Sequence, residues 1–520
     1  MTPSLKCKPV VLIILDGWGI GLKKRNNAVS LARTPVFDRL WSSNPHSTLQ
    51  ASGRAVGLPS GQTGNSEAGH MNIGAGRIVE QDAIEISHRI NDGSFFRNPA
   101  FLYAVEHVKK NNSSMHLAGL LTGDQSAHAY PEHLHALLQL LAGYQIKKVF
   151  LHLFTDGRDS SPHGATKFIE KLQKHFLGDE KIATVIGRFY AMDRVKEWGR
   201  VKLAYEAMVE GKGWNAPSAQ DAITQAYNRG ENDEYIHPTV ICKDGEPVQL
   251  INNNDGIIFF NIRSDRVREI SKAFLQKEEF TGFERKKILS NIAFVTLTDY
   301  GPDLPGVRCA YPFRRVVNTL PFVFGSWRQL YISESEKYAH VTYFLNGGYP
   351  SPVAGEERVI IQSPRLYSYV QKPEMSSLDL TDFVLSSLEN DRYDIIVMNY
   401  PNADMVGHTG DIPAAVQAVE YLDFCMGRIE AMVRRKKGVL FITADHGNAD
   451  YMMNLQTGEI NTSHSHNPVP FIMTGDDVQR YALQPKGVLA NIAPTILDVV
   501  GIPKPPDMTS QSLCITKSNQ

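Results

Sequence analysis

The stretch Val10-Val-Leu-Ile-Ile-Leu-Asp-Gly-Trp-Gly19 joins six aliphatic residues to a carboxylate and a glycine-containing turn. A short aliphatic run that stops at such a turn predicts a buried β-strand. Further apolar runs with the same ending occur at 149–154, 257–260, 292–297, 395–398 and 439–442, and helical patterns between them include 132–141, 165–176 and 414–435. This alternation predicts an α/β protein with largely parallel sheets.

Aspartate and histidine side chains follow several of these predicted strands. In open α/β sheets, ligands bind beyond the carboxyl ends of the strands. The residues concerned are Asp16, Asp404, His408, Asp445, His446 and His464. Any one of them can instead cap a helix or form a turn, as an aspartate after a strand often does. Together they predict two divalent-metal centres, which lie about 3.5–4 Å apart in enzymes that act on phosphoryl groups. Mixed carboxylate and imidazole ligands suit Mn²⁺ or Zn²⁺ and argue against a pure Ca²⁺ cage.

A serine lies in the glycine-rich segment Gly61-Gln-Thr-Gly-Asn-Ser-Glu-Ala-Gly-His70. The glycines allow close backbone approach, and free amides at a helix start favour an anion. A serine hydroxyl is a weak nucleophile unless a base or metal activates it, and the candidate ligands supply that metal. Ser66 is therefore the candidate nucleophile. A P-loop is excluded, because residues 57–63 are one residue short and carry Gln62 where that motif has lysine.

The chain has 520 residues, which is more than a single core usually holds. Because the candidate ligands come from both ends of the chain, we expect one discontinuous catalytic domain, residues 1–80 and 309–520. The middle, residues 81–308, is expected to be an inserted α/β domain that binds substrate.

The middle segment places arginines in turns after predicted strands: Arg158, Arg188, Arg194, Arg263 and Arg266. The guanidinium fork suits bidentate binding of phosphate or carboxylate. Surface salt bridging is the alternative for any one of them. Asp159, beside Arg158, is a candidate general base.

Composition limits the classes of partner. The formal net charge is −1 and no stretch reaches the roughly 20 apolar residues of a membrane span, so we expect neither nucleic-acid nor membrane binding. The cysteines are odd in number and scattered, which predicts reduced thiols in a cytoplasmic protein: Cys7, Cys242, Cys309, Cys425 and Cys514.

Longer motifs carry a resemblance to a known family. They are LDGWG (15–19), ASGRAVGLPSGQTGNSEAGHMNIGAGR (51–77), FTDGRD (154–159), GRFYAMDR (187–194), EKYAHVTYFLNGG (336–348), PNADMVGHTGD (401–411), TADHGNAD (443–450) and TSHSHNPVP (462–470). Nearly end to end, the chain resembles the cofactor-independent (2,3-bisphosphoglycerate-independent) phosphoglycerate mutases of the alkaline phosphatase superfamily. The resemblance implies a three-layer α/β/α domain, split in sequence, with a second α/β domain inserted.

The resemblance also implies roles for single residues. Asp404, His408 and His464 would hold one metal, and Asp16, Asp445, His446 and the Ser66 oxygen the other, with Mn²⁺ as the usual ion. Ser66 would be transiently phosphorylated. Phosphoglycerate would be bound by His128, Arg158, Asp159, Arg188, Arg194, Arg263, Arg266 and Lys337.

Some positions depart from the family pattern. The family usually has SDGGVHSH where this chain has TGDQSAHAY, so the assignment of His128 requires a small insertion. Ser264 replaces a usual proline, Val195 a common acidic residue, and His466 a threonine beside His464. None of these changes removes a presumed ligand or the nucleophile.

The expected function is interconversion of 3-phosphoglycerate and 2-phosphoglycerate in glycolysis and gluconeogenesis by a monomeric isomerase. Ser66 would take the phosphoryl group, Asp159 a proton from the attacking hydroxyl, and Lys337 would stabilise developing charge. Closure of the inserted domain would exclude water. A related metal-dependent phosphatase or phosphopentomutase is the first alternative, and a metal-binding scaffold without catalysis is the second.

Overall fold

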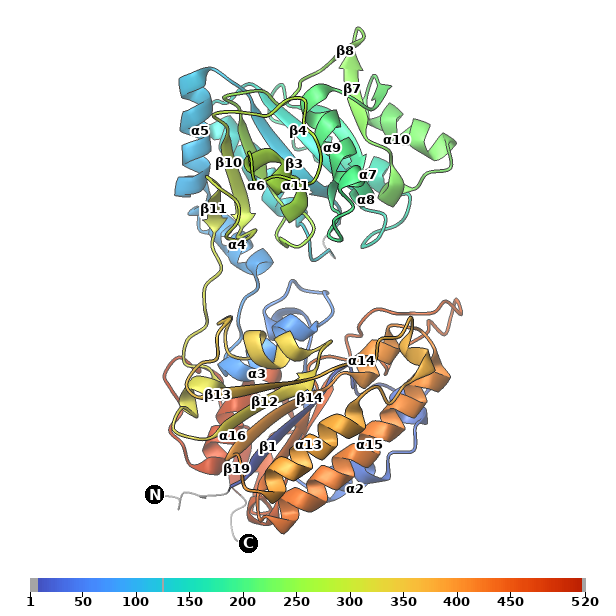
Figure 1. The fold of residues 1–520 in the computed structure, drawn as a ribbon, viewed down its shortest axis with the longest axis vertical. Helices are drawn as coiled ribbons and strands as arrows, with labels where there is room; N and C mark the ends of the chain where they lie inside the picture. Colours follow the sequence, from blue (N-terminus) through green and yellow to red (C-terminus); the bar gives the residue numbers. More distant parts are fainter. Residues whose placement is uncertain (1–7, 124–125, 517–520) are drawn as a thin grey trace. The chain divides into compact units, whose positions relative to one another are not determined.

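The computed structural model describes residues 8–123 and 126–516, so Cys7 and two residues of the TGDQSAHAY stretch lie outside the described residues. The chain forms two compact units (Figure 1). Unit 1 comprises Met1–Gln81 and Arg314–Gln520, and unit 2 comprises Asp82–Phe313.

Unit 1 is built on an eight-stranded sheet in the order β13-β12-β14-β1-β15-β16-β2-β18. The strands are β1 (Val10–Leu15), β2 (His46–Gln50), β12 (Gln329–Glu334), β13 (Glu356–Ile361), β14 (Ile395–Tyr400), β15 (Val439–Thr443), β16 (Val469–Thr474) and β18 (Lys486–Val488). The five strands from β13 to β15 are parallel, whereas β16 runs antiparallel to both β15 and β2. A separate pair joins β17 (Tyr481–Leu483) to β19 (Cys514–Thr516).

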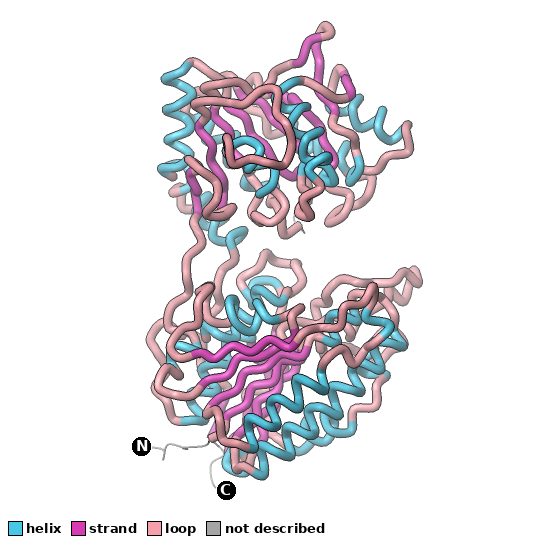
Figure 2. Tube along the Cα trace, in the orientation of Figure 1, coloured by secondary structure: helices cyan, strands magenta, loops and turns pink. Residues whose placement is uncertain are grey.

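Helices cover both faces of this sheet. Every residue of β1, β14 and β15 is therefore buried. The longer helices are α2 (Pro35–Ser43), α3 (Ser66–Ala75), α13 (Ser377–Glu389), α15 (Ile412–Arg435) and α16 (Ile492–Val500), and the short ones are α1 (Ala28–Leu31), α12 (Leu320–Val323) and α14 (Asn402–Gly407). Figure 2 shows the α13 and α15 side of the sheet, with the other helices of unit 1 around it. The predicted layered α/β class is confirmed.

Unit 2 contains a nine-stranded sheet in the order β11-β10-β9-β3-β4-β5-β7-β6, with β8 beside β7. Its strands are β3 (Met115–Leu121), β4 (Val149–Thr155), β5 (Lys181–Gly187), β6 (Trp214–Ala216), β7 (Thr239–Lys243), β8 (Glu246–Pro247), β9 (Gly256–Phe259), β10 (Ala293–Thr298) and β11 (Arg308–Tyr311). Its helices are α4 (Asp82–Asn91), α5 (Pro99–Asn111), α6 (Pro131–Gly143), α7 (Ala165–Gln173), α8 (Arg188–Ala191), α9 (Trp198–Glu210), α10 (Ala219–Asn228) and α11 (Arg268–Leu275). Successive residues of β3 belong to two separate apolar clusters: Leu117 packs in one cluster and Ala118 packs in the other. Each face of this sheet therefore has its own core.

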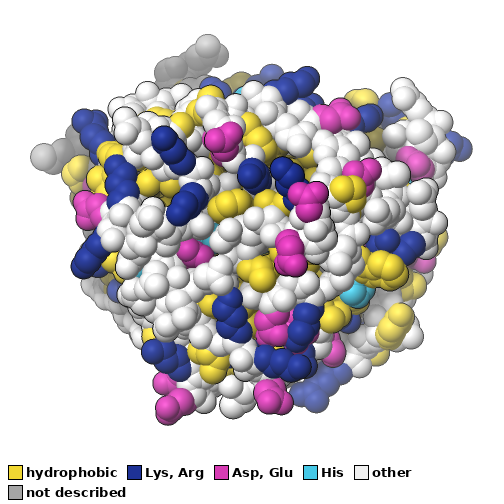
Figure 3. Space-filling view, turned by 90° about the horizontal axis from the view of Figure 1, so that it is seen from above, with side chains coloured by type: hydrophobic (Ala, Val, Ile, Leu, Met, Phe, Trp, Pro, Cys, Tyr) yellow, Lys and Arg dark blue, Asp and Glu magenta, His cyan; other side chains and the backbone are white. Residues whose placement is uncertain are grey.

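The surface is of mixed charge. On the face drawn in Figure 3, positive and negative side chains are scattered among polar and apolar ones. None of the described helices is long and apolar enough to cross a membrane.

The central strand β1 provides the test of the core. Leu12→Ala should destabilise unit 1 by about 2–5 kcal/mol, because it leaves a cavity at a fully buried position between β14 and β15. Leu22→Ala, at a position that is 74% exposed in the same unit, should change stability by less than about 0.5 kcal/mol. Urea unfolding of both variants measures this, and equal losses of stability would contradict the core position of β1.

Candidate metal centre and active site

Three neighbouring strands bring the candidate ligands of unit 1 together. Asp16 follows β1, Asp404 lies in α14 directly after β14, and Asp445 and His446 follow β15. Because β14, β1 and β15 are parallel neighbours, their carboxyl ends lie at one edge of the sheet. Gly17 makes the close approach possible: its φ is +78°, and a Cβ there would lie 2.6 Å from the Asp404 Cα.

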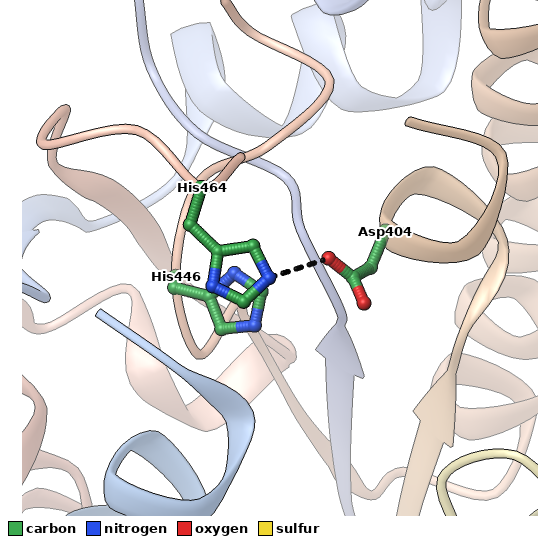
Figure 4. Close-up of side chains that lie close together, drawn as sticks. All are labelled: Asp404, His446 and His464. Atoms are coloured by element: carbon green, nitrogen blue, oxygen red, sulfur yellow. Dashed lines mark ion pairs between the residues drawn. The ribbon is translucent and has the colours of Figure 1, made fainter. Parts of the chain in front are cut away.

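The ligand atoms form two overlapping groups. Those of Asp404, His446 and His464 lie within 4.8 Å of one another, and so do those of Asp16, Asp445 and His446. Figure 4 shows the first group, in which His464 Nε2 is 3.2 Å from Asp404 Oδ1 and the His464 ring stacks on that of His446. His408 also reaches this place, with Nε2 3.3 Å from Asp404 Oδ1. The structure therefore brings together every predicted ligand of unit 1.

Two imidazoles are oriented by backbone carbonyls. His408 Nδ1 donates to the Thr462 carbonyl at 2.7 Å, and His464 Nδ1 donates to the Gly64 carbonyl at 2.7 Å. These bonds place a proton on each Nδ1, so that in the neutral ring each Nε2, which lies beside Asp404, has its lone pair for a metal ion. This is the arrangement of a metal-ligating histidine.

Ser66 is the first residue of α3, and the side chain of Asn65 caps the helix by accepting from the Ala68 amide. The Ser66 hydroxyl lies 3.3 Å from Asp16 Oδ1 and 2.9 Å from His446 Nε2. The nucleophile predicted from the glycine-rich segment thus lies at a helix N-terminus against the second ligand group, where an anion is also favoured.

Lys337 lies at the middle of the centre. Its Nζ donates to Ser66 Oγ at 2.7 Å, to Asp16 Oδ1 at 2.8 Å and to Asp404 Oδ2 at 2.6 Å. Burial disfavours the ammonium, but the surrounding carboxylates outweigh that effect and hold the pKa of Lys337 above its ordinary value. Lys337 is therefore a cation beside the nucleophile.

The centre carries more negative charge than Lys337 compensates. Burial and then the neighbouring Asp445 raise the pKa of Asp16 to about 7. Asp445 Oδ2 is buried and accepts no hydrogen bond within the described part of the chain. Burial also lowers the pKa of His446 to about 3, so its imidazole is neutral and has a lone pair for a ligand. Buried carboxylates without full compensation beside the neutral imidazole of His446 fit a divalent cation.

Buried amides that the sequence reasoning missed also hold the carboxylates. Asn399 Nδ2 donates to Asp16 Oδ2 at 2.8 Å, and Asn448 Nδ2 donates to Asp404 Oδ1 at 2.9 Å. Asn399 is a polar residue inside an otherwise apolar strand, which was the available signal. Asn448 lies in the TADHGNAD motif, in which the sequence analysis assigned only Asp445 and His446 as metal ligands.

Unit 2 has a second polar site, a cavity of about 300 Å³. Four of the five predicted arginines line it: Arg158, Arg188, Arg194 and Arg266. The fifth, Arg263, lies near by, with Nε 3.6 Å from Asp265 Oδ1, and Arg194 binds the same aspartate at 3.1 Å. Burial, followed by repulsion from Arg194, lowers the pKa of Arg266. Such an accumulation of guanidinium groups favours an anionic ligand.

Asp159 and His128 adjoin the arginines. Asp159 accepts from the Ser126 hydroxyl at 2.7 Å and pairs with Arg188 at 3.1 Å. Burial alone would raise the pKa of Asp159, but Arg188 outweighs it and the pKa lies below its ordinary value. Burial and then Arg188 lower the pKa of His128 to about 4. The cluster thus contains an anionic carboxylate and a neutral imidazole. Lys337, which was predicted together with these residues as a substrate ligand, lies instead in the centre of unit 1.

Comparisons with known proteins cover nearly the whole chain. A model of the Metalloenzyme superfamily matches residues 8–504. The 2,3-bisphosphoglycerate-independent phosphoglycerate mutase of Clostridium novyi is 48% identical over 510 residues, which is 97% of this chain and 99% of that protein. The 2,3-bisphosphoglycerate-independent phosphoglycerate mutase 2 of Methanosarcina barkeri is 48% identical over 526 residues, 98% of this chain and 99% of that one.

A solved structure shows the same relationship. The phosphoglycerate mutase of Leishmania mexicana, crystallised at low cobalt concentration, superposes with a TM-score of 0.77 at 29% identity and covers 99% of both chains. The resemblance predicted from the motifs is confirmed: the chain belongs to the 2,3-bisphosphoglycerate-independent phosphoglycerate mutases of the metalloenzyme superfamily.

Proposed function

We propose that this protein interconverts 3-phosphoglycerate and 2-phosphoglycerate without 2,3-bisphosphoglycerate, through a phosphoserine at Ser66. It is an isomerase that binds divalent metal, as its family membership indicates. The observation that supports the proposal most is the Ser66 hydroxyl, which lies against two ligand groups and the Lys337 ammonium at the start of a helix.

The metal assignment is the one that the family resemblance implies, and the two groups of ligand atoms support it. We assign Asp404, His408 and His464 to one ion and Asp16, Asp445, His446 and the Ser66 oxygen to a second. Both ions are proposed to be Mn²⁺, for which mixed oxygen and nitrogen ligands are suited. When bound, the ions supply charge neutralisation and favour ionisation of the serine hydroxyl.

The residues of unit 1 carry the phosphoryl transfer. Ser66 attacks phosphorus in line with the departing glycerate oxygen, and the second half-reaction reverses this step with the other glycerate hydroxyl as the acceptor. Lys337 already donates to Ser66 Oγ, so its ammonium can stabilise negative charge on the serine, phosphoryl or leaving oxygen. The free amides at the start of α3 favour the phosphoserine anion.

The residues of unit 2 are proposed to bind phosphoglycerate and to retain glycerate between the two half-reactions. Arg158, Arg188, Arg194, Arg263 and Arg266 supply guanidinium groups for its anionic groups, and His128 a neutral imidazole. Asp159 is anionic and can take the proton of the attacking hydroxyl, because its depressed pKa keeps it ionised at neutral pH.

The arginine cavity also argues against the alternatives. A phosphatase needs no group that retains the dephosphorylated product, and a phosphopentose carries no carboxylate to match so many guanidinium groups. The intact set of ligands and nucleophile argues against a scaffold without catalysis.

The remaining assignments concern the setting of the enzyme. We propose a monomer, with a small molecule as its substrate. We propose the cytoplasm as its location, because the four described cysteines are free thiols and the substrate is a glycolytic intermediate.

Ser66→Ala tests the nucleophile. The variant should fold normally and lose mutase activity to background, and phosphoserine should no longer be detected by mass spectrometry after incubation with substrate. Ser60→Ala, at an exposed serine immediately before the same glycine-rich segment, is the control and should keep wild-type activity. Substantial turnover by the Ser66 variant would refute the phosphoserine route, and so would dependence of the wild type on added 2,3-bisphosphoglycerate.

Removal of metal should abolish activity, and lowered pH should weaken metal binding. Exhaustive chelation should abolish activity and Mn²⁺ should restore it. The Asp404 contact outweighs burial and holds the pKa of His408 above its ordinary value, so protons compete with metal near neutrality. Affinity for Mn²⁺ should therefore decline as pH falls from about 8 to about 6 and imidazoles become cations. Calorimetric titration with Mn²⁺ at several pH values measures this, and a pH-independent affinity would contradict the assignment of His408.

Arg266→Ala tests retention of glycerate. Loss of one charged hydrogen-bonding group, worth about 1.5–3 kcal/mol, should lower kcat/KM for 3-phosphoglycerate by about 10- to 100-fold. The share of turnovers that release inorganic phosphate should rise, because escape of glycerate exposes phospho-Ser66 to water. Arg89→Ala, a surface arginine paired with Glu85, is the control. A coupled mutase assay run beside a phosphate-release assay measures both effects, and wild-type values for Arg266→Ala would remove this residue from the proposed clamp.

A further inference from the structure

A buried hydrogen-bonded bridge lies behind the proposed metal centre. It begins at His70, one turn after Ser66 on α3, where His70 Nδ1 donates to the Ser66 carbonyl at 2.9 Å. It continues to Asn399 on β14, whose Nδ2 lies 3.0 Å from His70 Nε2 and 2.8 Å from Asp16 Oδ2. His70, Asn399 and Asp16 are all fully buried.

The donors and acceptors of the bridge are matched throughout. The carbonyl of Ser66 can only accept, so His70 Nδ1 carries the proton, and in the neutral ring Nε2 accepts. The Asn399 amide has two protons, one for His70 Nε2 and one for the Asp16 carboxylate. Its oxygen faces the other way, toward the Ser333 hydroxyl at 3.3 Å. The carboxylate on one side and the hydroxyl on the other determine the orientation of the amide.

The bridge joins parts of the centre that come from different elements. His70 Nδ1 is also 3.3 Å from Asp445 Oδ2, so this ring touches the start of α3 and the residue after β15. The imidazole of His340 lies beside it, with ring centroids 5.7 Å apart. Burial lowers the pKa of His340 to about 2, so this neighbour is neutral and adds no charge. A side chain enclosed in this way has little freedom to turn.

We propose that His70 and Asn399 are positioning residues, which set the Asp16 carboxylate and the first turn of α3 in the orientation that binds divalent metal and presents Ser66. The proposal rests on the metal centre proposed above. Neither residue touches substrate in it; both act through Asp16 and Ser66. Groups that orient ligands in this way typically change metal affinity by about 10- to 100-fold when they are removed.

Titration of the metal-free protein with Mn²⁺ alone tests the proposal independently of catalysis. Asn399→Ala and His70→Asn should each bind Mn²⁺ about 10- to 100-fold more weakly than the wild type. His70→Gln, whose amide oxygen can take the place of Nε2, should retain more affinity than His70→Asn, which reaches only the Nδ1 position. In the double variant Asn399→Ala/His70→Asn the losses should not add, because both changes break one bridge.

A kinetic measurement and a matched control separate positioning from stability. The variants should lower kcat and leave KM for 3-phosphoglycerate within about twofold, because the proposed substrate contacts lie elsewhere. Asn346→Ala removes an equally buried amide of unit 1 that bonds to Tyr349 and Glu356, and it should leave Mn²⁺ affinity unchanged.

The outcomes are distinguishable. Wild-type Mn²⁺ affinity in folded Asn399→Ala and His70→Asn proteins would overturn the positioning role, as would equal losses in Asn346→Ala. A wild-type protein that bound no Mn²⁺ would overturn the proposed metal centre itself.

Discussion

Three carboxylates that are almost completely removed from water, Asp16, Asp404 and Asp445, form the constraint on which unit 1 depends. Burial of carboxylates is costly unless cations and hydrogen bonds compensate for the lost water. One ammonium, that of Lys337, contacts two of the three directly. The remaining negative charge explains why divalent ions fit there, with imidazole nitrogens beside the carboxylates as further ligands.

The sheet makes this concentration of charge possible. The ligands follow three adjacent parallel strands, β14, β1 and β15, whose apolar residues are buried on both faces. The apolar interior stabilises the strands, and their carboxyl ends present the polar side chains at one edge. Gly17 allows the turn after β1 to lie against Asp404.

The two units have opposite electrostatic character at their polar sites. The centre of unit 1 is rich in carboxylates, which suit cations, whereas the cavity of unit 2 is rich in guanidinium groups, which suit anions. In the proposed reaction the first site transfers a phosphoryl group and the second holds a small carboxylated molecule. This division explains why one chain needs both a metal centre and an arginine cluster, since metal-assisted transfer to serine alone would not retain glycerate.

The sequence by itself determined the strands that carry the metal ligands and the chemical types of those ligands, because apolar runs and turn residues act locally. It located the runs that form β1 and β15 and the serine in its glycine-rich turn. Only the tertiary structure decided which distant residues meet. Ser66 contacts Lys337 although the two residues are 271 positions apart in the chain. The antiparallel direction of β16 was also not predicted, because the sequence pattern indicated only largely parallel sheets. Asn399 directly follows the apolar run 395–398 in the sequence, and its bond to Asp16 depends on β14 lying beside β1. Contacts of this kind depend on the pairing of strands far apart in the chain, which no local pattern encodes.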